Sequence, residues 1–155
     1  MISTVNDLLD SSQSGKFITA NFRGFNQALT PKMDTKNKKI MIADDDPGIV
    51  DAVEMLLEFE GYEVTSTVDG TTVLDMKDEL PDLLLLDIWM SGEDGRDICR
   101  KLKQDELTKD IPVIMISASR DIRDSAMMAG ADDFLAKPFD MDDLLKKVAY
   151  FVQKT

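Results

Sequence analysis

Three aspartates of this chain directly follow or end apolar runs, where their carboxylates would stand at the edge of a folded core. Asp44 and Asp45 follow the first such run, and Asp87 ends a run of four leucines without an intervening glycine or proline. Carboxylates about 4 Å apart repel one another by roughly 1 to 4 kcal/mol, so such a cluster calls for a cation. Oxygen ligands without histidine or cysteine favour a hard cation such as Mg²⁺. The three aspartates therefore predict a Mg²⁺ site.

Two further polar side chains stand at the ends of later apolar runs and indicate the reaction that the site would serve. Ser117 ends one run, and Lys137 follows the next and precedes a proline. Aspartate is a known nucleophile toward phosphorus, and phosphoryl transfer requires mainly positioning and neutralisation of charge. We therefore expect Asp87 to accept a phosphoryl group whose oxygens are stabilised by the hydroxyl and the ammonium group. Taken singly, each residue is more simply explained as a cap of the following helix, but the set is not.

The elements that would bring these residues together lie in residues 38–155. Short apolar runs alternate five times with amphipathic stretches, which predicts a doubly wound parallel sheet with helices on both faces. Ligands bind such sheets outside the carboxyl ends of the strands, where the residues above would stand. The predicted strands are Lys39–Ala43, Glu63–Thr67, Leu83–Asp87, Val113–Ser117 and Asp133–Ala136. The predicted helices are one around Ile49 to Leu57 that stops at Gly61, and others over about 71–79, 95–104, 121–129 and 141–152.

The overall composition narrows the classes of function. The net charge of −12 argues against nucleic-acid binding, because phosphate backbones select clustered lysine and arginine. The absence of histidine removes histidine metal sites, histidine general bases and phosphohistidine chemistry within the chain. No apolar run approaches the ~20 residues of a membrane span and no secretory signal begins the chain, so we expect a cytoplasmic protein that does not bind membranes. The single cysteine, Cys99, is interpreted as part of an apolar helix face.

Residues 1–37 differ in composition from the rest of the chain. They are rich in serine, asparagine, threonine and glycine and show no sustained periodicity. We therefore expect a flexible N-terminal extension followed by one domain over residues 38–155. Met33 could be the true start of the protein, which N-terminal sequencing of native material would settle.

Four segments of the chain resemble the receiver domain of bacterial response regulators. They are IMIADDDPGIV at 40–50, LLLLDIWMSGEDG at 83–95, VIMISAS at 113–119 and DFLAKPF at 133–139. Each motif is moderately specific, but the four occur in the family's order and each stands at the end of a predicted strand. The resemblance covers about residues 38–153. It implies a flavodoxin-like (βα)5 fold with five parallel strands in the order 2-1-3-4-5.

The resemblance also implies roles for residues around the metal ion. Asp45 is expected to bind Mg²⁺ directly and Asp44 mainly through water. Asp87 is expected to be the phosphoacceptor and a third ligand. Trp89, two places further on, is expected to give the metal its backbone carbonyl.

A second set of residues is expected around the phosphoryl group. The resemblance implies that the Ser117 hydroxyl moves toward the phosphoryl group and hydrogen-bonds it, aided by the backbone N–H of Ala118. Lys137 would pair with phosphoryl oxygens, and the bond between Lys137 and Pro138 would be cis. Phe134 occupies the aromatic switch position, where it lacks the hydroxyl of the more common tyrosine. Ser117 and Phe134 are therefore the expected switch residues.

Besides Phe134, three further positions depart from the family's usual pattern or vary within it. Ser91 replaces a proline often found four places after the phosphoacceptor, and we expect this change to loosen the loop without touching a functional group. Trp89 and Ser119 occupy positions that tune how fast water removes the phosphoryl group. Because the indole is bulky, we predict slow self-dephosphorylation.

The function implied is that of a phosphoacceptor module in a two-component phosphorelay, which assists only its own phosphorylation and dephosphorylation. Lacking histidine, the chain would take its phosphoryl group from a histidine kinase, a histidine phosphotransfer protein or a small acyl phosphate. Phosphorylation would shift an existing conformational equilibrium, and the output would be contact with a downstream protein target. The chain ends soon after the last predicted helix, so we expect a stand-alone receiver, either monomeric or forming a phosphorylation-dependent homodimer.

Two other classes of function remain open at this point. A pseudo-receiver would signal through protein contacts without phosphate. A haloacid-dehalogenase-like phosphatase is suggested by Asp44 and Asp46 after the first strand, with Ser117 and Lys137 following, and it would use Asp44 as the nucleophile. Against the phosphatase, Gly48 stands where that family prefers threonine or valine. Hydrolysis of a generic phosphate ester would distinguish it.

Overall fold

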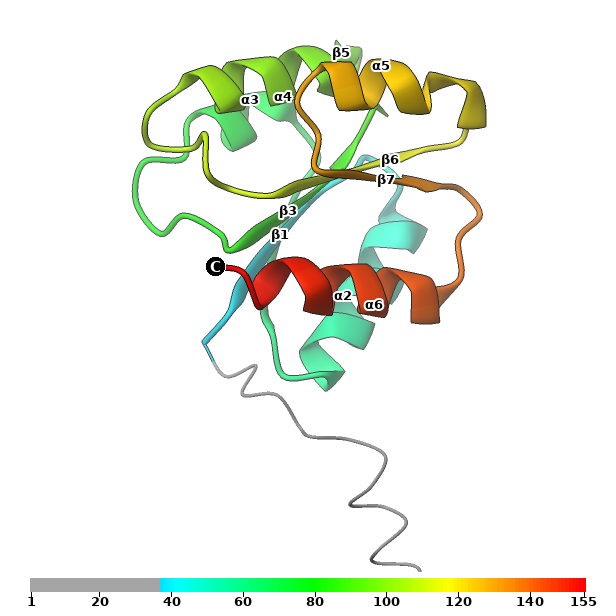
Figure 1. Cartoon of the computed structure of the whole chain (residues 1–155). Helices are drawn as coiled ribbons and strands as arrows, with labels where there is room; N and C mark the ends of the chain where they lie inside the picture. Colours follow the sequence, from blue (N-terminus) through cyan, green and yellow to red (C-terminus); the bar gives the residue numbers. More distant parts are fainter. Residues whose placement is uncertain (1–36) are drawn as a thin grey trace, which may run out of the picture. The chain divides into compact units, whose positions relative to one another are not determined.

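A computed structural model describes residues 37–155 of this chain (Figure 1). Five parallel strands form one sheet in the order β2-β1-β3-β6-β7, which confirms the predicted order 2-1-3-4-5. The predicted extension, and Met33 with it, lies outside the described residues apart from Asn37. The five strands have the predicted bounds: β1 Lys39–Ala43, β2 Glu63–Thr67, β3 Leu83–Asp87, β6 Val113–Ser117 and β7 Asp133–Ala136.

Helices cover both faces of this sheet (Figure 1). On one face lie α2 (Pro47–Phe59) and α6 (Met141–Val152). On the other lie α3 (Gly70–Leu74), α4 (Gly95–Gln104) and α5 (Arg123–Met128), the last preceded by the 3₁₀ helix η1 (Arg120–Ile122). This two-sided cover is the doubly wound architecture that the alternating pattern predicted.

Within residues 37–155, aspartates cap the N-termini of four of the five α-helices. Each accepts backbone N–H groups of the first turn, which would otherwise lack partners. Asp46 is one of them, since its Oδ1 accepts from Gly48 and Ile49 and Pro47 follows it as the first helical residue. The simpler explanation of a strand-end aspartate as a helix cap therefore holds for Asp46. The other three caps are Asp69, Asp94 and Asp140.

The second helix is shorter than predicted. We expected it over about residues 71–79, but α3 ends at Leu74. Glu79 has a φ of +52°, outside the right-handed helical region. Leu80 precedes Pro81, and the proline ring disfavours helical geometry at the residue before it. The prediction was wrong because it extended the helix to the last residues before the proline.

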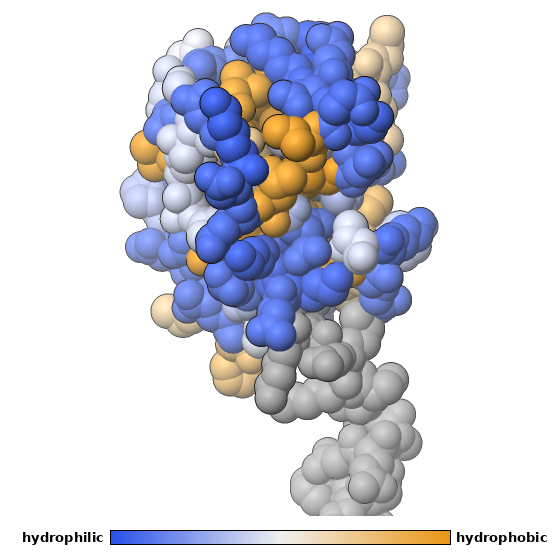
Figure 2. Space-filling view, turned by 90° about the vertical axis from the view of Figure 1, so that its left-hand side faces the viewer, coloured by the Kyte–Doolittle hydropathy of each residue, from blue (hydrophilic) through white to orange (hydrophobic). Residues whose placement is uncertain are grey.

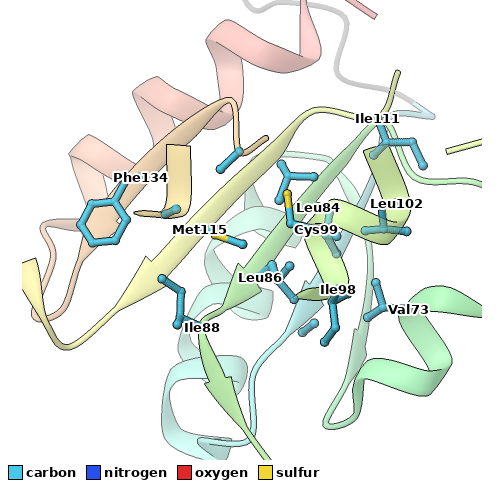
Figure 3. Packing of buried hydrophobic residues seen from close by; sticks show 14 of the residues in the cluster. Val73, Leu84, Leu86, Ile88, Ile98, Cys99, Leu102, Ile111, Met115 and Phe134 are labelled. Carbon is cyan, nitrogen blue, oxygen red and sulfur yellow. The ribbon is translucent and has the colours of Figure 1, made fainter. Parts of the chain in front are cut away.

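Each face of the sheet has its own hydrophobic core. Leu84 and Leu86 pack with α3, α4 and α5, whereas Leu83 and Leu85 pack with α2 and α6. Strand β3 is consequently buried along its whole length. Figure 3 shows Cys99 of α4 among the leucines of the first core. Burial raises the pKa of the Cys99 thiol to about 11, so the cysteine is a core residue as interpreted from the sequence.

A two-stranded antiparallel hairpin, which the sequence patterns did not predict, follows β3. Its strands are β4 (Trp89–Met90) and β5 (Glu93–Asp94). The turn between them consists of Ser91 and Gly92, with φ of +48° and +80°. Positive φ at both central positions is typical of the type I′ turn of two-residue hairpins. The hairpin thus begins two residues after Asp87, beside the predicted site.

The side of the described domain that Figure 2 shows is largely hydrophilic. There a strip of hydrophobic residues lies between hydrophilic ones. Partly buried Leu74, Met76 and Leu80 pack against the core formed with α3, α4 and α5. Within residues 37–155, no helix combines the length and the hydropathy needed to span a membrane.

Candidate functional site

The register of the sheet places two of the predicted carboxylates side by side. Ala43 of β1 pairs with Leu86 of β3, so the residues that follow them, Asp44 and Asp87, stand at the same edge. Asp45 follows Asp44 directly in the sequence. One carboxylate oxygen from each of the three aspartates lies within 4.8 Å of the others. The structure therefore brings together the three acidic residues that the sequence singled out.

Lys137 connects this cluster to β7. Its Nζ lies 2.8 Å from Asp44 Oδ2 and 3.3 Å from Asp87 Oδ1. The bond between Lys137 and Pro138 is cis, as the resemblance implied. Because β7 lies two strands away from β3, only the folded sheet brings the lysine to these two aspartates.

Ser117 stands at the same edge, at the end of β6. It is 1% exposed, and its Oγ accepts the backbone N–H of Ser119 at 3.1 Å. Its carbonyl oxygen accepts the Lys137 N–H at 2.7 Å, which ties the ends of β6 and β7 together. The following residue, Ala118, is exposed. A hydroxyl and an exposed backbone segment therefore lie on the β6 side of Asp87.

The cluster carries more negative charge than Lys137 neutralises. Three carboxylates and one ammonium group leave a net charge of −3 + 1 = −2. Burial, and then the charge of Asp44, raise the pKa of Asp87 to about 6 even though Lys137 opposes the shift. Burial alone would lower the pKa of Lys137, but its hydrogen bond to Asp44 and the charges of Asp44 and Asp87 raise it. An all-oxygen cluster with this surplus of charge fits a hard divalent cation such as Mg²⁺.

Asp44 is held on both of its oxygens. Its Oδ1 accepts the Asp46 N–H at 2.9 Å, its Oδ2 accepts from Lys137, and the residue is 1% exposed. A carboxylate fixed in this way is poorly placed to attack a substrate. This arrangement counts against the phosphatase alternative, in which Asp44 would be the nucleophile.

Asp45 is held by the hairpin turn. Its Oδ2 accepts the Ser91 backbone N–H at 2.9 Å, and the Ser91 hydroxyl donates to the Val68 carbonyl oxygen at 2.9 Å. The expectation that Ser91 touches no functional group was therefore wrong. The Ser-Gly pair at 91–92 is a turn signal, but no local pattern shows which distant group the turn contacts.

Trp89 and Arg96 form a second contact at the hairpin. Trp89 is 59% exposed, and the guanidinium carbon of Arg96 lies 5.3 Å from its ring centroid. Arg96 also donates to both carboxylate oxygens of Asp94 and to the Ser125 hydroxyl at 3.0 Å. Arg96 was not singled out from the sequence, because its partners lie on three different elements.

The expected switch residue Phe134 is buried. It is 5% exposed and packs in the core formed with α3, α4 and α5 (Figure 3). It pairs with Met115 across β6 and β7, three residues before Lys137 along the chain. Strand β7 therefore contains Phe134 and leads directly to Lys137 of the site.

Comparison with known proteins identifies the family. The family model of the response regulator receiver domain matches residues 40–149. This chain belongs to that family. The match confirms the resemblance that the four motifs indicated. Receiver domains are the phosphoacceptor modules of two-component systems.

Among its relatives, the receiver is similar to the DNA-binding dual master transcriptional regulator RpaA of Synechocystis sp. The two are 42% identical over 120 residues, which make up 76% of this chain and 50% of RpaA. Response regulator PleD of Caulobacter vibrioides is 45% identical over 105 residues, which make up 66% of this chain and 23% of PleD. The chain thus spans half or less of the length of these relatives.

Solved structures show the same fold. A putative response regulator from Chloroflexus aurantiacus has a TM-score of 0.72 and 32% identity, covering 76% of this chain and 99% of that one. The receiver domain of the sensor histidine kinase PA1611 from Pseudomonas aeruginosa has a TM-score of 0.68 and 26% identity, covering 76% and 98%. That structure holds a magnesium ion in its active site cleft.

Proposed function

We propose that this receiver accepts a phosphoryl group on Asp87 and holds Mg²⁺ through Asp44, Asp45, Asp87 and the backbone carbonyl of Trp89. The observation that carries the proposal is the cluster of three carboxylates within 4.8 Å, with a net charge of −2 after Lys137 is counted. The magnesium ion in the active site cleft of the PA1611 receiver supports the choice of metal.

The residues around Asp87 divide the chemistry of phosphoryl transfer between them. A carboxylate oxygen of Asp87 attacks the phosphorus, the bond from phosphorus to the donor's imidazole nitrogen breaks, and the imidazole leaves with the bonding electrons and takes up a proton. Lys137 pairs with phosphoryl oxygens, and Ser117 and the Ala118 N–H hydrogen-bond them. Mg²⁺, when bound, supplies positive charge that offsets the charge of the carboxylates and the phosphoryl group. Asp44 holds Lys137 in position, since its Oδ2 accepts from Lys137 Nζ at 2.8 Å.

The donor in this proposal is a histidine kinase or a histidine phosphotransfer protein, with small acyl phosphates as an alternative source. Support comes from the absence of histidine in the chain, which leaves no internal phosphohistidine. Because such donors draw on the ATP of the cell interior, a cytoplasmic location is part of the proposal.

The output in this proposal is contact with a downstream protein, through a conformational shift that involves Ser117 and Phe134 and that could include formation of a homodimer. Both residues lie on the neighbouring strands β6 and β7, which end at the site. The surplus of acidic residues argues against direct contact with nucleic acid.

Intact-mass measurement tests the proposal. The native chain and Asp87→Asn would be incubated with acetyl phosphate, each with Mg²⁺ and with EDTA. We expect one phosphoryl adduct on the native chain in Mg²⁺ only. An equal adduct on Asp87→Asn would contradict the assignment of Asp87, and Mg²⁺ binding without any adduct would favour a pseudo-receiver that signals without phosphate.

A further inference from the structure

The hairpin places one exposed aromatic ring beside the site. Trp89 opens β4, two residues after Asp87, and is 59% exposed. Within residues 37–155 it belongs to neither hydrophobic core. An exposed side chain samples several rotamers unless a neighbouring group holds it. The contact that holds this ring therefore decides where its bulk lies relative to the phosphoacceptor.

Arg96 at the start of α4 supplies such a contact. Its guanidinium carbon lies 5.3 Å from the Trp89 ring centroid, within the about 6 Å over which a cation attracts an aromatic ring. Asp94 is the cross-strand partner of Trp89, and opposite residues of an antiparallel pair carry their side chains on the same face. Asp94 accepts Arg96 Nε at 2.9 Å and Nη2 at 2.6 Å. Asp94 therefore holds the guanidinium group on the face of the hairpin that carries the indole.

A second element fixes the same guanidinium group. Arg96 Nη1 donates to Ser125 Oγ of α5 at 3.0 Å, and the Ser125 hydroxyl donates to the Ile122 carbonyl oxygen at 2.9 Å. The guanidinium group is planar, with its donors in a rigid fork, so bonds to two partners leave it little freedom to rotate. Hydrogen bonds from Arg96 lower the pKa of Asp94, as expected of a paired carboxylate. Arg96 is thus immobilised between the hairpin and α5.

We propose that Arg96 is a positioning residue that holds the Trp89 indole in one orientation, and that this orientation limits how readily water reaches a phosphoryl group on Asp87. The inference rests on the proposed function, since it takes Asp87 to be the phosphoacceptor. In the hydrolysis concerned, a water oxygen forms the new bond to phosphorus and the bond to the Asp87 oxygen breaks. The carboxylate leaves with the bonding electrons, and a proton of the water passes to the solvent. Ser125 contributes by anchoring the arginine on α5.

The first test follows the ring in the metal-free protein. Trp89 is the single tryptophan, so time-resolved fluorescence anisotropy of the whole chain in EDTA reports on this ring alone. Arg96→Met removes the charge and the donors. Arg100→Met is the matched control, because Arg100 also lies on α4 and pairs with Asp97. We expect the amplitude of the sub-nanosecond motion to rise about twofold in Arg96→Met and to stay native in Arg100→Met. Equal amplitudes in the native chain and Arg96→Met, or equal rises in both variants, would overturn the inference.

The second test measures hydrolysis of the phosphorylated chains. After reaction with acetyl phosphate and Mg²⁺, loss of the adduct from the intact mass should be about three- to fivefold faster in Arg96→Met than in the native chain. In a Trp89→Ala background, Arg96→Met should alter the rate by less than about 1.5-fold, since the two residues act through one contact. The same acceleration with and without the indole would overturn the inference, because the arginine would then act independently of the ring.

A milder variant covers the case in which Arg96→Met disturbs the start of α4. Ser125→Ala removes the anchor on α5 and keeps the pairing of Arg96 with Asp94. We expect hydrolysis about twofold faster in Ser125→Ala, again only when the indole is present. Unaltered hydrolysis in both Arg96→Met and Ser125→Ala would overturn the inference and leave the proposed function intact. Absence of any adduct on the native chain would instead contradict the proposed function, and the anisotropy comparison, which needs neither metal nor phosphate, would still decide whether Arg96 holds the ring.

Discussion

Lys137 Nζ lies 2.8 Å from Asp44 Oδ2, and Asp44 is 1% exposed. The lysine is therefore engaged mainly with a neighbour of the proposed phosphoacceptor, while its distance to Asp87 Oδ1 is 3.3 Å. Burial, and then the charge of Asp44, which Lys137 leaves incompletely balanced, raise the pKa of Asp87 to about 6. Several measurable properties of the metal-free protein depend on this imbalance.

The first prediction concerns the pH dependence of stability. Asp87 has a native pKa of about 6 against an ordinary aspartate value of 3.8, so the native state binds this proton more tightly than the unfolded state does. Stability from this group is therefore lost as pH rises from about 4 to about 7, by roughly 1 to 3 kcal/mol after allowance for solvent screening. In EDTA, Asp87→Asn should exceed the native chain in unfolding free energy by this amount at pH 7.5 and by much less at pH 4. Urea unfolding at both pH values measures the difference.

An exposed carboxylate provides the control for this experiment. Asp110→Asn should change the unfolding free energy by less than about 0.5 kcal/mol at either pH. A stabilisation by Asp87→Asn that is the same at pH 4 and pH 7.5 would contradict the proposed cause. Mg²⁺ should reduce the difference in unfolding free energy between Asp87→Asn and the native chain. The cation stabilises the native chain more, because only the native chain retains the Asp87 carboxylate as a metal ligand.

The second prediction concerns Lys137. Lys137→Met leaves the buried carboxylates of Asp44 and Asp87 without their ammonium partner. In EDTA at pH 7.5 we expect a loss of about 2 to 4 kcal/mol in unfolding free energy, part of which Mg²⁺ restores. Lys109→Met, which removes an exposed pair with Glu106, should cost less than about 1 kcal/mol. Equal losses of unfolding free energy in the two variants would show that Lys137 does not stabilise the fold through its pairing with the buried carboxylates.

The third prediction concerns the lifetime of the phosphorylated state. The Trp89 indole stands two residues after Asp87, with the guanidinium group of Arg96 5.3 Å from its ring centroid. If the ring shields the phosphoryl group, phosphorylated Trp89→Ala should lose its phosphoryl group by hydrolysis several-fold faster than the phosphorylated native chain. Loss of the adduct in the intact mass measures both rates. Phe59→Ala, which removes an exposed aromatic ring from α2, should leave the rate unaltered. A native half-life of seconds, or no effect of Trp89→Ala, would contradict the shielding.

The fourth prediction concerns Gly95, the first residue of α4. A Cβ at this position would lie 2.4 Å from the Asp87 backbone oxygen and 3.0 Å from the Ile88 Cα. Gly95→Ala should therefore displace the proposed phosphoacceptor, lowering stability by roughly 1 to 3 kcal/mol and slowing phosphorylation by acetyl phosphate at least tenfold. Gly92→Ala is a matched comparison, because its Cβ would meet nothing within 4 Å and only its φ of +80° opposes the change. Similar phosphorylation rates for both variants would argue against the steric effect.

The strands and the cluster of carboxylates were predictable because their signals are local. Four leucines ending in Asp87 indicate a strand buried on both faces, and parallel strands align their carboxyl ends at one edge. The hairpin and the end of the second helix were not predictable in this way. The left-handed backbone at Glu79 has no sequence signal, and Ser91 finds Asp45 only because the two meet in the folded chain. Arg96 was missed for the same reason, since Ser125 lies 29 positions away.

The most direct test of the central claim is to locate the phosphoryl group on the chain. After reaction with acetyl phosphate and Mg²⁺, borohydride reduction converts an aspartyl phosphate to homoserine, which peptide mass spectrometry assigns to a position. We predict homoserine at position 87 alone and none in reactions that contain EDTA. Homoserine at position 44 or 45, with none at 87, would contradict the assignment of Asp87 as the phosphoacceptor.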